Sequence, residues 1–496
     1  MKNKNRKIYS QLHKWTGIMV CLFMCVFCIS GLILNHRHMY SNVNVSRRWL
    51  PSGYQFSNWN NGLLRGTVPF VAKGSRNNDA SYLIYGAGGI FSADSAGNVI
   101  SDFNRELPAS ADKRNIRAIA MTSDSTYFSV SRFGVYRLVS DGWNEICSEG
   151  LPKRKLVGSD NDYTDIITKG DSLIVVSRSR IYIAQAPYNQ FKEVQIASTK
   201  DFDHSVSLFR VIWMAHAGDL YGLPTKILSD LMAIILLIVS LTGIVFFVSK
   251  RRVKWLTRHS FKWHNSLGKW TIVLSVFIAL TGWMLRPPVL LALVKGSVPA
   301  IPGSVLDNDN QWEDRLRMLR WDENLDGWLL STADGIFFLN DLHATPKRVT
   351  NQPPVSVMGL NVFEREGNDW ILGSFSGIYR WNPIAGIYQD MITNETTLPS
   401  SAPAKAGPPI GRYMCSGYTS VFGGKQIAVN YTEGTKDIPQ PEEYVNLPMS
   451  LWSVALELHN GRCYPLCSGL GASLFIFIAG ILLLICLLTG YLVRKR

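Results

Sequence analysis

The stretch Leu12-His13-Lys14-Trp15-Thr16-Gly17 opens the first apolar segment of the chain. A similar stretch, Trp263-His264-Asn265-Ser266-Leu267-Gly268, stands before the third apolar segment. A small-residue pair follows both at the same spacing: Ser30-Gly31 lies 17 and 18 residues after His13, and Thr281-Gly282 lies 17 and 18 residues after His264. This repetition predicts a duplicated membrane core that carries one histidine in the same register of each copy.

Four segments are apolar and approach the length of about 20 residues that a helix needs to cross a bilayer. They are 15–34, 227–248, 270–285 and 470–493. The first has the basic start of a signal peptide, but it is longer than a typical apolar signal core. His36-Arg37-His38 also stands where a small-residue cleavage site would be. We therefore expect this segment to be retained as a span.

The positive charge is concentrated beside the spans. Residues 1–14, 250–269 and 494–496 together hold fifteen Lys and Arg and no Asp or Glu, whereas the formal net charge of the whole chain is +14. This is the positive-inside pattern, which predicts that both termini and the middle segment are cytoplasmic. Because membrane topology explains the charge, we expect the lipid bilayer as a partner and no nucleic acid.

These observations predict a multi-pass membrane protein with a large part outside the cytoplasm. The expected segments are a cytoplasmic arm with the first span (1–36), a periplasmic β region (37–225), the second span (226–249), a basic cytoplasmic loop (250–269), the third span (270–288), a second periplasmic β region (289–469), and the fourth span with a basic tail (470–496).

The two periplasmic regions contain a weak repeat. Each unit is an apolar strand, a turn, and then Gly-apolar-aromatic, as in Gly89-Ile90-Phe91, Gly134-Val135-Tyr136 and Gly377-Ile378-Tyr379. Neighbouring units lie about 42 to 46 residues apart, a period typical of β-propeller blades. Neither region alone makes a comfortable closed ring, so we predict one propeller assembled from both insertions. Two separate β-sandwich domains are the alternative.

The two halves of the chain also align, at their first spans and at the ends of their exported regions. The run from Leu208 to Gly218 resembles the run from Leu451 to Gly461, with His216 and His459 at matching positions. Each run leads into a span that ends in Leu-Thr-Gly. Residues 1–250 and 251–496 are therefore expected to be two copies of one unit.

Four histidines thus occupy equivalent positions. The topology predicts His13 and His264 at the cytoplasmic face and His216 and His459 at the outer face. A pseudo-twofold axis along the membrane normal would bring each pair together, as two axial ligands of a haem iron require. Gly31 and Gly282, 18 residues beyond a histidine on the same helical face, would let a bulky ring approach the backbone.

Simpler interpretations exist for each feature taken alone. An interfacial histidine beside tryptophan is often a membrane anchor, and a small residue in a span is often a helix-packing contact. The matched set of four histidines with matched glycines strengthens the haem hypothesis against both. His36, at the outer end of the first span, is a further candidate ligand for the outer pair. The spacing of Cys463 and Cys467 leaves open whether they form a disulfide.

These motifs resemble the PepSY-associated transmembrane family, which includes bacterial inner-membrane ferric-siderophore reductases. The resemblance rests on the segments around His13 and His264 with their small-residue pairs, and on Ala215-His216-Ala217-Gly218 followed by Leu241-Thr242-Gly243. It covers about 130 residues around the spans. It implies haem ligation by His13, His216, His264 and His459, although the periplasmic regions look like propeller blades rather than the compact α/β PepSY module.

The function expected from these points is electron transfer across the membrane by one or two b-type haems. The acceptor would be a periplasmic ferric chelate, such as a ferric siderophore, or a partner protein. The sequence contains no glycine-rich flavin or NAD fingerprint, so a cytoplasmic reductase or a quinol would supply the electrons. The alternative is a non-enzymatic sensor or partner-binding protein whose periplasmic domain is anchored by the four spans.

Overall fold

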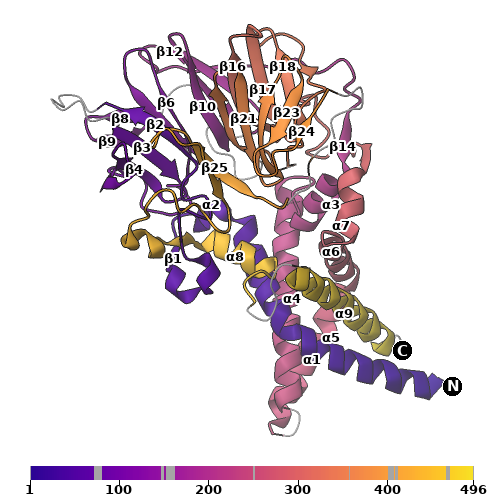
Figure 1. Ribbon diagram of the computed structural model, residues 1–496. Coiled ribbons are helices and arrows are strands. Elements are labelled where there is room, and N and C mark those ends of the chain that lie inside the picture. The colour runs from indigo at the N-terminus through magenta and orange to yellow at the C-terminus, as the bar shows by residue number, and fades with distance from the viewer. Residues whose placement is uncertain are drawn as a thin grey trace.

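The computed structural model describes residues 2–71, 81–146, 150–151, 162–249, 252–356, 358–399, 407, 411–464 and 470–494. Long helices occupy one end of the molecule and small antiparallel β-sheets occupy the other (Figure 1). Both ends of the chain lie together at the helical end (Figure 1). Cys467 lies outside the described residues, so its pairing with Cys463 is untested.

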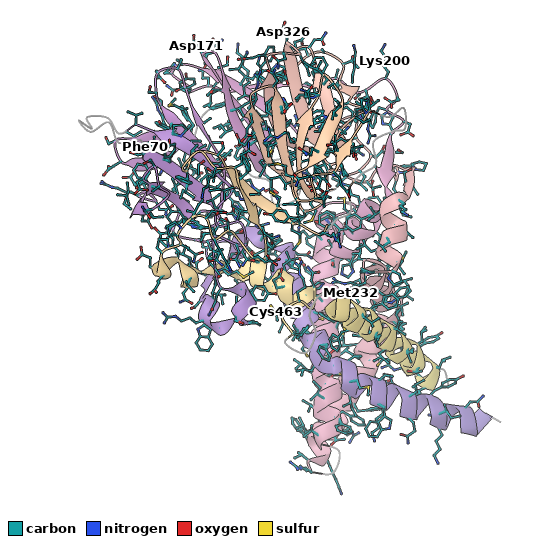
Figure 2. All side chains as sticks on the ribbon, viewed as in Figure 1. Phe70, Asp171, Lys200, Met232, Asp326 and Cys463 are labelled. Carbon is teal, nitrogen blue, oxygen red and sulfur yellow. The ribbon has the colours of Figure 1, made fainter. Side chains whose placement is uncertain are left out.

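Three described helices are long and apolar enough to cross a membrane: α1 (Lys2–Asn35), α4 (Leu223–Ser249) and α9 (Leu470–Arg494). A fourth crossing is obtained when α5 (Lys254–Trp270) and α6 (Ile272–Met284) are taken as one span that bends by 73°. Helices α1 and α4 pack through a small apolar cluster that contains Met24 of α1 and Leu236 of α4. Met232 of α4 is also buried and lies below the sheets (Figure 2).

The basic segment 250–269 is not the loop that its charge predicted. Helix α5 occupies most of it, because Lys and Arg are good helix formers and the segment contains no proline. Phe261 of α5 packs against Phe246 of α4, with 5.4 Å between ring centroids. His264 therefore lies within a helix, and Gly282 lies beyond the bend at Thr271. The expectation that these two residues share one helical face is wrong, whereas His13 and Gly31 do share the continuous helix α1.

Short elements join the helices to the sheets in two matching sets. After α1 come α2 (Arg37–Tyr40) and β1 (Asn44–Val45), and β1 pairs with β27 (Met449–Ser450), which leads into α8 (Leu451–His459). After α6 come α7 (Val289–Lys295) and β15 (Ser297–Pro299), and β15 pairs with β14 (Ser205–Ser207), which leads into α3 (Leu208–Ala217). Each half of the chain thus pairs with the other half at the base of the sheets.

Within the described residues, the β region contains six further antiparallel sheets in chain order. The first three contain β2 (Gly66–Phe70), β3 (Ser81–Gly86), β4 (Gly89–Ala93) and β5 (Val99–Asp102); β6 (Ile116–Met121), β7 (Tyr127–Ser131), β8 (Val135–Val139) and β9 (Gly142–Glu145); and β10 (Tyr163–Lys169), β11 (Ser172–Ser177), β12 (Ile181–Gln185) and β13 (Lys192–Val194).

The second half of the chain supplies the other three sheets. They contain β16 (Leu316–Asp322), β17 (Gly327–Thr332), β18 (Gly335–Leu339) and β19 (Lys347–Arg348); β20 (Leu360–Glu366), β21 (Asp369–Ser374), β22 (Gly377–Asn382), β23 (Ile387–Asp390) and β24 (Thr396–Thr397); and β25 (Cys415–Thr419) with β26 (Ile427–Asn430). Single-turn 3-10 helices lie at Arg47–Trp49, Ser52–Tyr54 and Glu442–Asn446.

An apolar core fills each space between consecutive sheets. Trp143 lies in the core between the first and second sheets, and Trp381 lies in the core between the fourth and fifth. The last sheet contacts the first through β25 and β2, and Trp59 and Val429 belong to the core that these two share. The two β regions therefore form one domain, and the alternative of two separate sandwiches is wrong.

Candidate functional site

The four repeat-equivalent histidines meet as two pairs. The ring centroids of His13 and His264 are 6.0 Å apart with the planes tilted by 54°. Those of His216 and His459 are 6.2 Å apart with a tilt of 52°. Both pairings are those predicted from the duplication, and the two geometries are nearly identical.

Each histidine ring lies against a glycine of the other half of the chain. His459 of α8 contacts the backbone of α1 at Gly31, and His216 of α3 contacts α6 at Gly282. In the same way, His13 of α1 lies against Gly490 of α9. His264 of α5 lies against Gly243 of α4. Gly31 and Gly282 were expected to let a bulky cofactor ring approach the backbone. In the structure each is instead a seat for an imidazole ring of the opposite repeat.

The Nδ1 atom of each ring is held by the helix on which the ring lies. The Nδ1 atom of His13 lies 2.9 Å from the carbonyl oxygen of Cys486, and that of His264 lies 2.9 Å from the carbonyl oxygen of Val239. The Nδ1 atom of His216 lies 3.1 Å from the carbonyl oxygen of Ile278. In each case the carbonyl stands four residues before the seat glycine. The Nδ1 atom of His459 lies 2.9 Å from the hydroxyl oxygen of Ser30, which precedes its seat glycine.

The clash of an added side chain with the ring is most severe at Gly282 and Gly490, because a helical side chain leans toward the N-terminus and covers the preceding turn. Without a Cβ atom, the carbonyl of that turn is open to the imidazole. A Cβ atom added at Gly282 would lie 2.6 Å from Cε1 of His216, and one at Gly490 would lie 2.8 Å from Cε1 of His13. Both distances are shorter than a normal van der Waals contact.

The bonds made by Nδ1 leave Nε2 available. Three of the rings face a backbone carbonyl, which can only accept, so Nδ1 carries the proton and Nε2 carries a lone pair. Within the described residues, none of the four Nε2 atoms has a hydrogen-bond partner. Burial is the main cause that lowers the pKa of His216 to about 4 and the pKa of His459 to about 3. Both outer imidazoles are therefore neutral, which is the form that ligates metals.

The donor set fits an iron between two imidazoles. Two metal–nitrogen bonds of about 2 Å each, with about 1 Å from each nitrogen to its ring centre, place collinear ring centres roughly 6 Å apart. The observed centroid separations agree with this value. The hydrogen bond at Nδ1 is the outer-shell contact that typically orients a metal-bound histidine. The ring separation in each pair is therefore compatible with two imidazoles that ligate one iron.

His36 does not join the outer pair. Its Nε2 atom lies 2.7 Å from a carboxylate oxygen of Asp230 on α4. The amide of Asn35 donates to the other oxygen of the same carboxylate at 2.9 Å. These contacts with Asp230 link the end of α1 to α4. The His36 ring therefore pairs with Asp230 and not with His216 or His459. Among the described residues, no group of three or more His, Cys, Asp and Glu could hold a metal ion.

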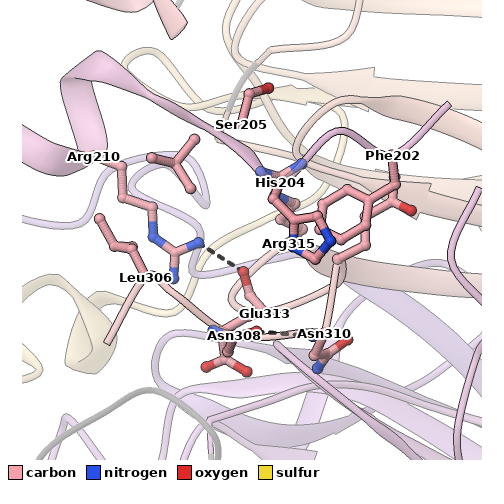
Figure 3. Close-up of a pocket in the computed structure, with 11 residues that line it drawn as sticks. Phe202, His204, Ser205, Arg210, Leu306, Asn308, Asn310, Glu313 and Arg315 are labelled. Atoms are coloured by element: carbon pink, nitrogen blue, oxygen red, sulfur yellow. Dashed lines mark hydrogen bonds between the residues drawn. The ribbon is translucent and has the colours of Figure 1, made fainter. Parts of the chain in front are cut away.

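Arg286 lies beside the pair of His216 and His459 and binds the end of α8. It follows α6, and its guanidinium donates to the carbonyl oxygen of His459 at 3.1 Å and to the side chain of Asn460 at 3.0 Å. A separate surface pocket lies near β14, where His204 and Phe202 stack and Arg210 donates to the carbonyl oxygen of Glu313 (Figure 3). None of the four paired histidines lines this pocket.

The family model for the PepSY-associated TM region matches this chain twice, over residues 1–250 and 228–496. The chain belongs to the PepSY-associated transmembrane family. The first match covers the first half of the sequence repeat, and the second covers the second half together with residues 228–250. The two halves each contribute two of the four paired histidines. The protein is therefore a membrane protein whose bilayer-spanning core is duplicated.

No curated protein shows significant sequence similarity to this family member. Among solved structures, two similar ones are the extracellular domain of the putative hybrid two component system BT4673 from B. thetaiotaomicron and that of the putative one component system BT4673. Both are 10% identical, with TM-scores of 0.31 and 0.30 over 72% and 76% of this chain. The match spans only 30% and 39% of those chains.

Sequence reasoning did not include Gly243 and Gly490 among the site residues. The signal was present, because Thr242-Gly243 and Thr489-Gly490 repeat the pattern of Ser30-Gly31 and Thr281-Gly282. In all four pairs the hydroxyl group donates to the carbonyl four residues earlier, at 2.7 to 2.9 Å. A small hydroxyl residue followed by glycine is thus the local signature of a ring seat.

Proposed function

We propose that this protein is a bacterial inner-membrane b-type haem protein that carries electrons across the bilayer to a periplasmic ferric chelate. The observation that carries the proposal is the occurrence of two histidine pairs with free Nε2 atoms and centroid separations of 6.0 and 6.2 Å. His13 with His264 would hold one haem, and His216 with His459 would hold a second. Each bound haem would supply reversible one-electron transfer at its iron.

The residues of the chain support the placement of one pair toward each face. Gly31 seats His459 and lies 18 residues beyond His13 on the continuous helix α1. At a rise of 1.5 Å per residue, the two levels are separated by roughly 27 Å along the helix, which approaches the thickness of the apolar core. An electron could therefore enter at one level and leave at the other.

The orientation in the membrane is part of the same proposal. Both chain ends lie at the end of the bundle opposite the sheets (Figure 1), and the basic residues cluster there. The positive-inside rule favours a cytoplasmic location for that end. A cytoplasmic reductase or a quinol would then reduce the pair formed by His13 and His264, and the β domain would stand in the periplasm beside His216 and His459.

We interpret the β domain as a six-bladed propeller built from both insertions. The six sheets contact one another in chain order, and the sixth contacts the first through β25 and β2. Each of the six apolar cores lies between two neighbouring sheets. Radial repetition of this kind leaves few unprotected sheet edges.

A sensor or partner-binding role is the second candidate. Arg37, directly after α1, makes an ion pair with Asp112 of the β domain and stacks on Trp452 of α8 at 3.7 Å. A ligand bound by the sheets could shift α1 and α8 through these contacts without any electron transfer.

The absorption spectrum of the purified full-length protein separates the two candidates. We expect a Soret band with sharp α-bands after reduction. His13→Ala and His459→Ala should each remove about half of the bound haem. His36→Ala is the matched control, because it removes a partly exposed histidine that pairs with Asp230, and it should leave the spectrum unchanged. A colourless but folded protein would overturn the electron-transfer proposal and leave the sensor role.

A further inference from the structure

Several sheets share an irregularity in their first strand. The register of β6 shifts between Ile116 and Ala118, and the register of β16 shifts between Leu316 and Met318. A bulge of this kind redirects the side chain of the extra residue. The residues at the equivalent shifts of β6, β10, β16, β20 and β25 are all polar: Arg117, Thr164, Arg317, Asn361 and Ser416.

Two more arginines stand beside these bulges. Arg132 follows β7, and its carbonyl oxygen accepts from the backbone N–H of Tyr163 at the start of β10. Arg178 follows β11, and its carbonyl oxygen accepts from the N–H of Leu316 at the start of β16. The turns that carry Arg132 and Arg178 therefore lie at the same end of the sheets as the bulges.

Contacts link these side chains into one cluster. Arg132 makes an ion pair with Asp162, whose carbonyl oxygen accepts from the backbone N–H of Arg178 at 2.9 Å. Arg178 makes an ion pair with Asp314, whose carbonyl oxygen accepts from the guanidinium of Arg317 at 3.0 Å. The side chains of Arg132 and Arg178 remain 22% and 27% exposed, so a small ligand can reach them.

The cluster carries more positive than negative charge. Arg117 makes no hydrogen bond or ion pair with a described residue, and its Nε atom is buried without a partner. The Nε atom of Arg65, which precedes β2, is likewise buried without a partner among the described residues. Burial lowers the pKa of Arg117 well below its usual range, and the nearby charges of Arg65 and Arg132 act in the same direction. Asp162 and Asp314 pair with Arg132 and Arg178, and Asp112 and Asp334 also act on the cluster. The Nε atoms of Arg65 and Arg117 keep no partner among the described residues, an arrangement that an anionic ligand would balance.

Two helices lead from this end of the β domain to the outer histidine pair. Arg210 near the start of α3 donates to the carbonyl oxygen of Glu313, beside Asp314, and stands six residues before His216 (Figure 3). Trp452 near the start of α8 stacks on Arg37 and stands seven residues before His459. At 1.5 Å per residue, these intervals are about 9 and 10 Å along the helices.

We propose that Arg65, Arg117, Arg132, Arg178 and Arg317 form a binding site for a polycarboxylate chelate of Fe(III). The planar guanidinium group binds carboxylates with two parallel hydrogen bonds, which makes arginine well suited to such a ligand. The choice of an iron chelate rests on the proposed function. Bound there, Fe(III) would accept one electron by way of the outer histidine pair and become Fe(II), without a covalent bond to the protein.

Calorimetric titration of the full-length protein in nanodiscs with gallium(III) citrate tests the site. Ga(III) has the charge of Fe(III) but is not reduced, so binding is measured independently of electron transfer. We expect the wild-type protein to bind, and Arg117→Gln and Arg317→Gln each to raise the Kd at least tenfold. Arg105→Gln is the matched control and should leave the Kd unchanged, because its side chain is 65% exposed and pairs with Asp141. Among the described residues, Arg117 makes no hydrogen bond or ion pair, so its variant should fold.

The absence of gallium citrate binding, or equal affinities in the wild type and both cluster variants, would overturn the site. Citrate alone binding as tightly as its gallium complex would overturn the chelate as the ligand. A colourless protein that binds gallium citrate through the arginines would sink the electron-transfer function and support the site. A haem protein that does not bind the complex would overturn only the site.

Discussion

Replacement of the seat glycines by alanine should have opposite outcomes at the two positions of the outer pair. The Cβ atom of an alanine at Gly31 would lie 3.5 Å from Cε1 of His459, an ordinary contact. The Cβ atom of an alanine at Gly282 would lie 2.6 Å from Cε1 of His216. To restore an ordinary contact, the His216 ring must move by about 0.9 Å, the difference between these two distances.

A movement of this size is large for a metal ligand, because ligand distances in metal sites hold within about 0.2 Å. The overpacking itself should cost only about 1–3 kcal/mol of unfolding free energy, so the variant should still fold. If the pair of His216 and His459 holds a haem as proposed, we expect Gly282→Ala to lose that haem or to give it a high-spin spectrum. Gly31→Ala should keep both haems in the low-spin form.

Pyridine haemochrome assays would measure the haem content per chain, and electron paramagnetic resonance would report the spin state. Gly471→Ala in α9 serves as a control, since a Cβ atom there meets nothing within 4 Å. If Gly31→Ala and Gly282→Ala retain the same haem content and spin state, the glycine-seat reasoning is refuted, even if the protein binds haem.

Three further predictions follow from other contacts. At the pair of His13 and His264, Gly490→Ala should perturb the spectrum of the proposed haem more than Gly243→Ala, because the added Cβ atoms would lie 2.8 Å from His13 and 3.3 Å from His264. Equal spectra would contradict this order. Arg37→Ala should lower the free energy of unfolding by about 3–5 kcal/mol in thermal melts, because it leaves the buried carboxylate of Asp112 without its ion pair; Arg48→Ala, at an exposed neighbouring position, should change it little. Trp381→Ala should cost about 3–5 kcal/mol by emptying a fully buried position between two sheets, and a melt like that of the wild type would show that this core does not hold the sheets together.

Much of the helical core could be predicted from residues close together in the sequence. Apolar length predicts a span, and the concentration of Lys and Arg in three short segments predicts which connections share a side. The repeat brings His13 together with His264, and His216 together with His459, because two copies of one unit pack around a common axis. The strand-rich nature of both insertions could also be predicted from their alternating apolar runs.

The four histidines, the small-residue pairs and the duplication could all be identified from the sequence alone. Each is a pattern of residue types and spacings that can be recognised without knowledge of the packing. Only the tertiary structure decided that each ring rests on a glycine of the opposite repeat, that the third span bends at Thr271, and that His36 binds Asp230. Packing also gathered Arg65, Arg117 and Arg317, which lie far apart in the sequence, at one end of the β domain. These features depend on contacts between distant segments, and the distances that set them are fixed only when helices and sheets pack together.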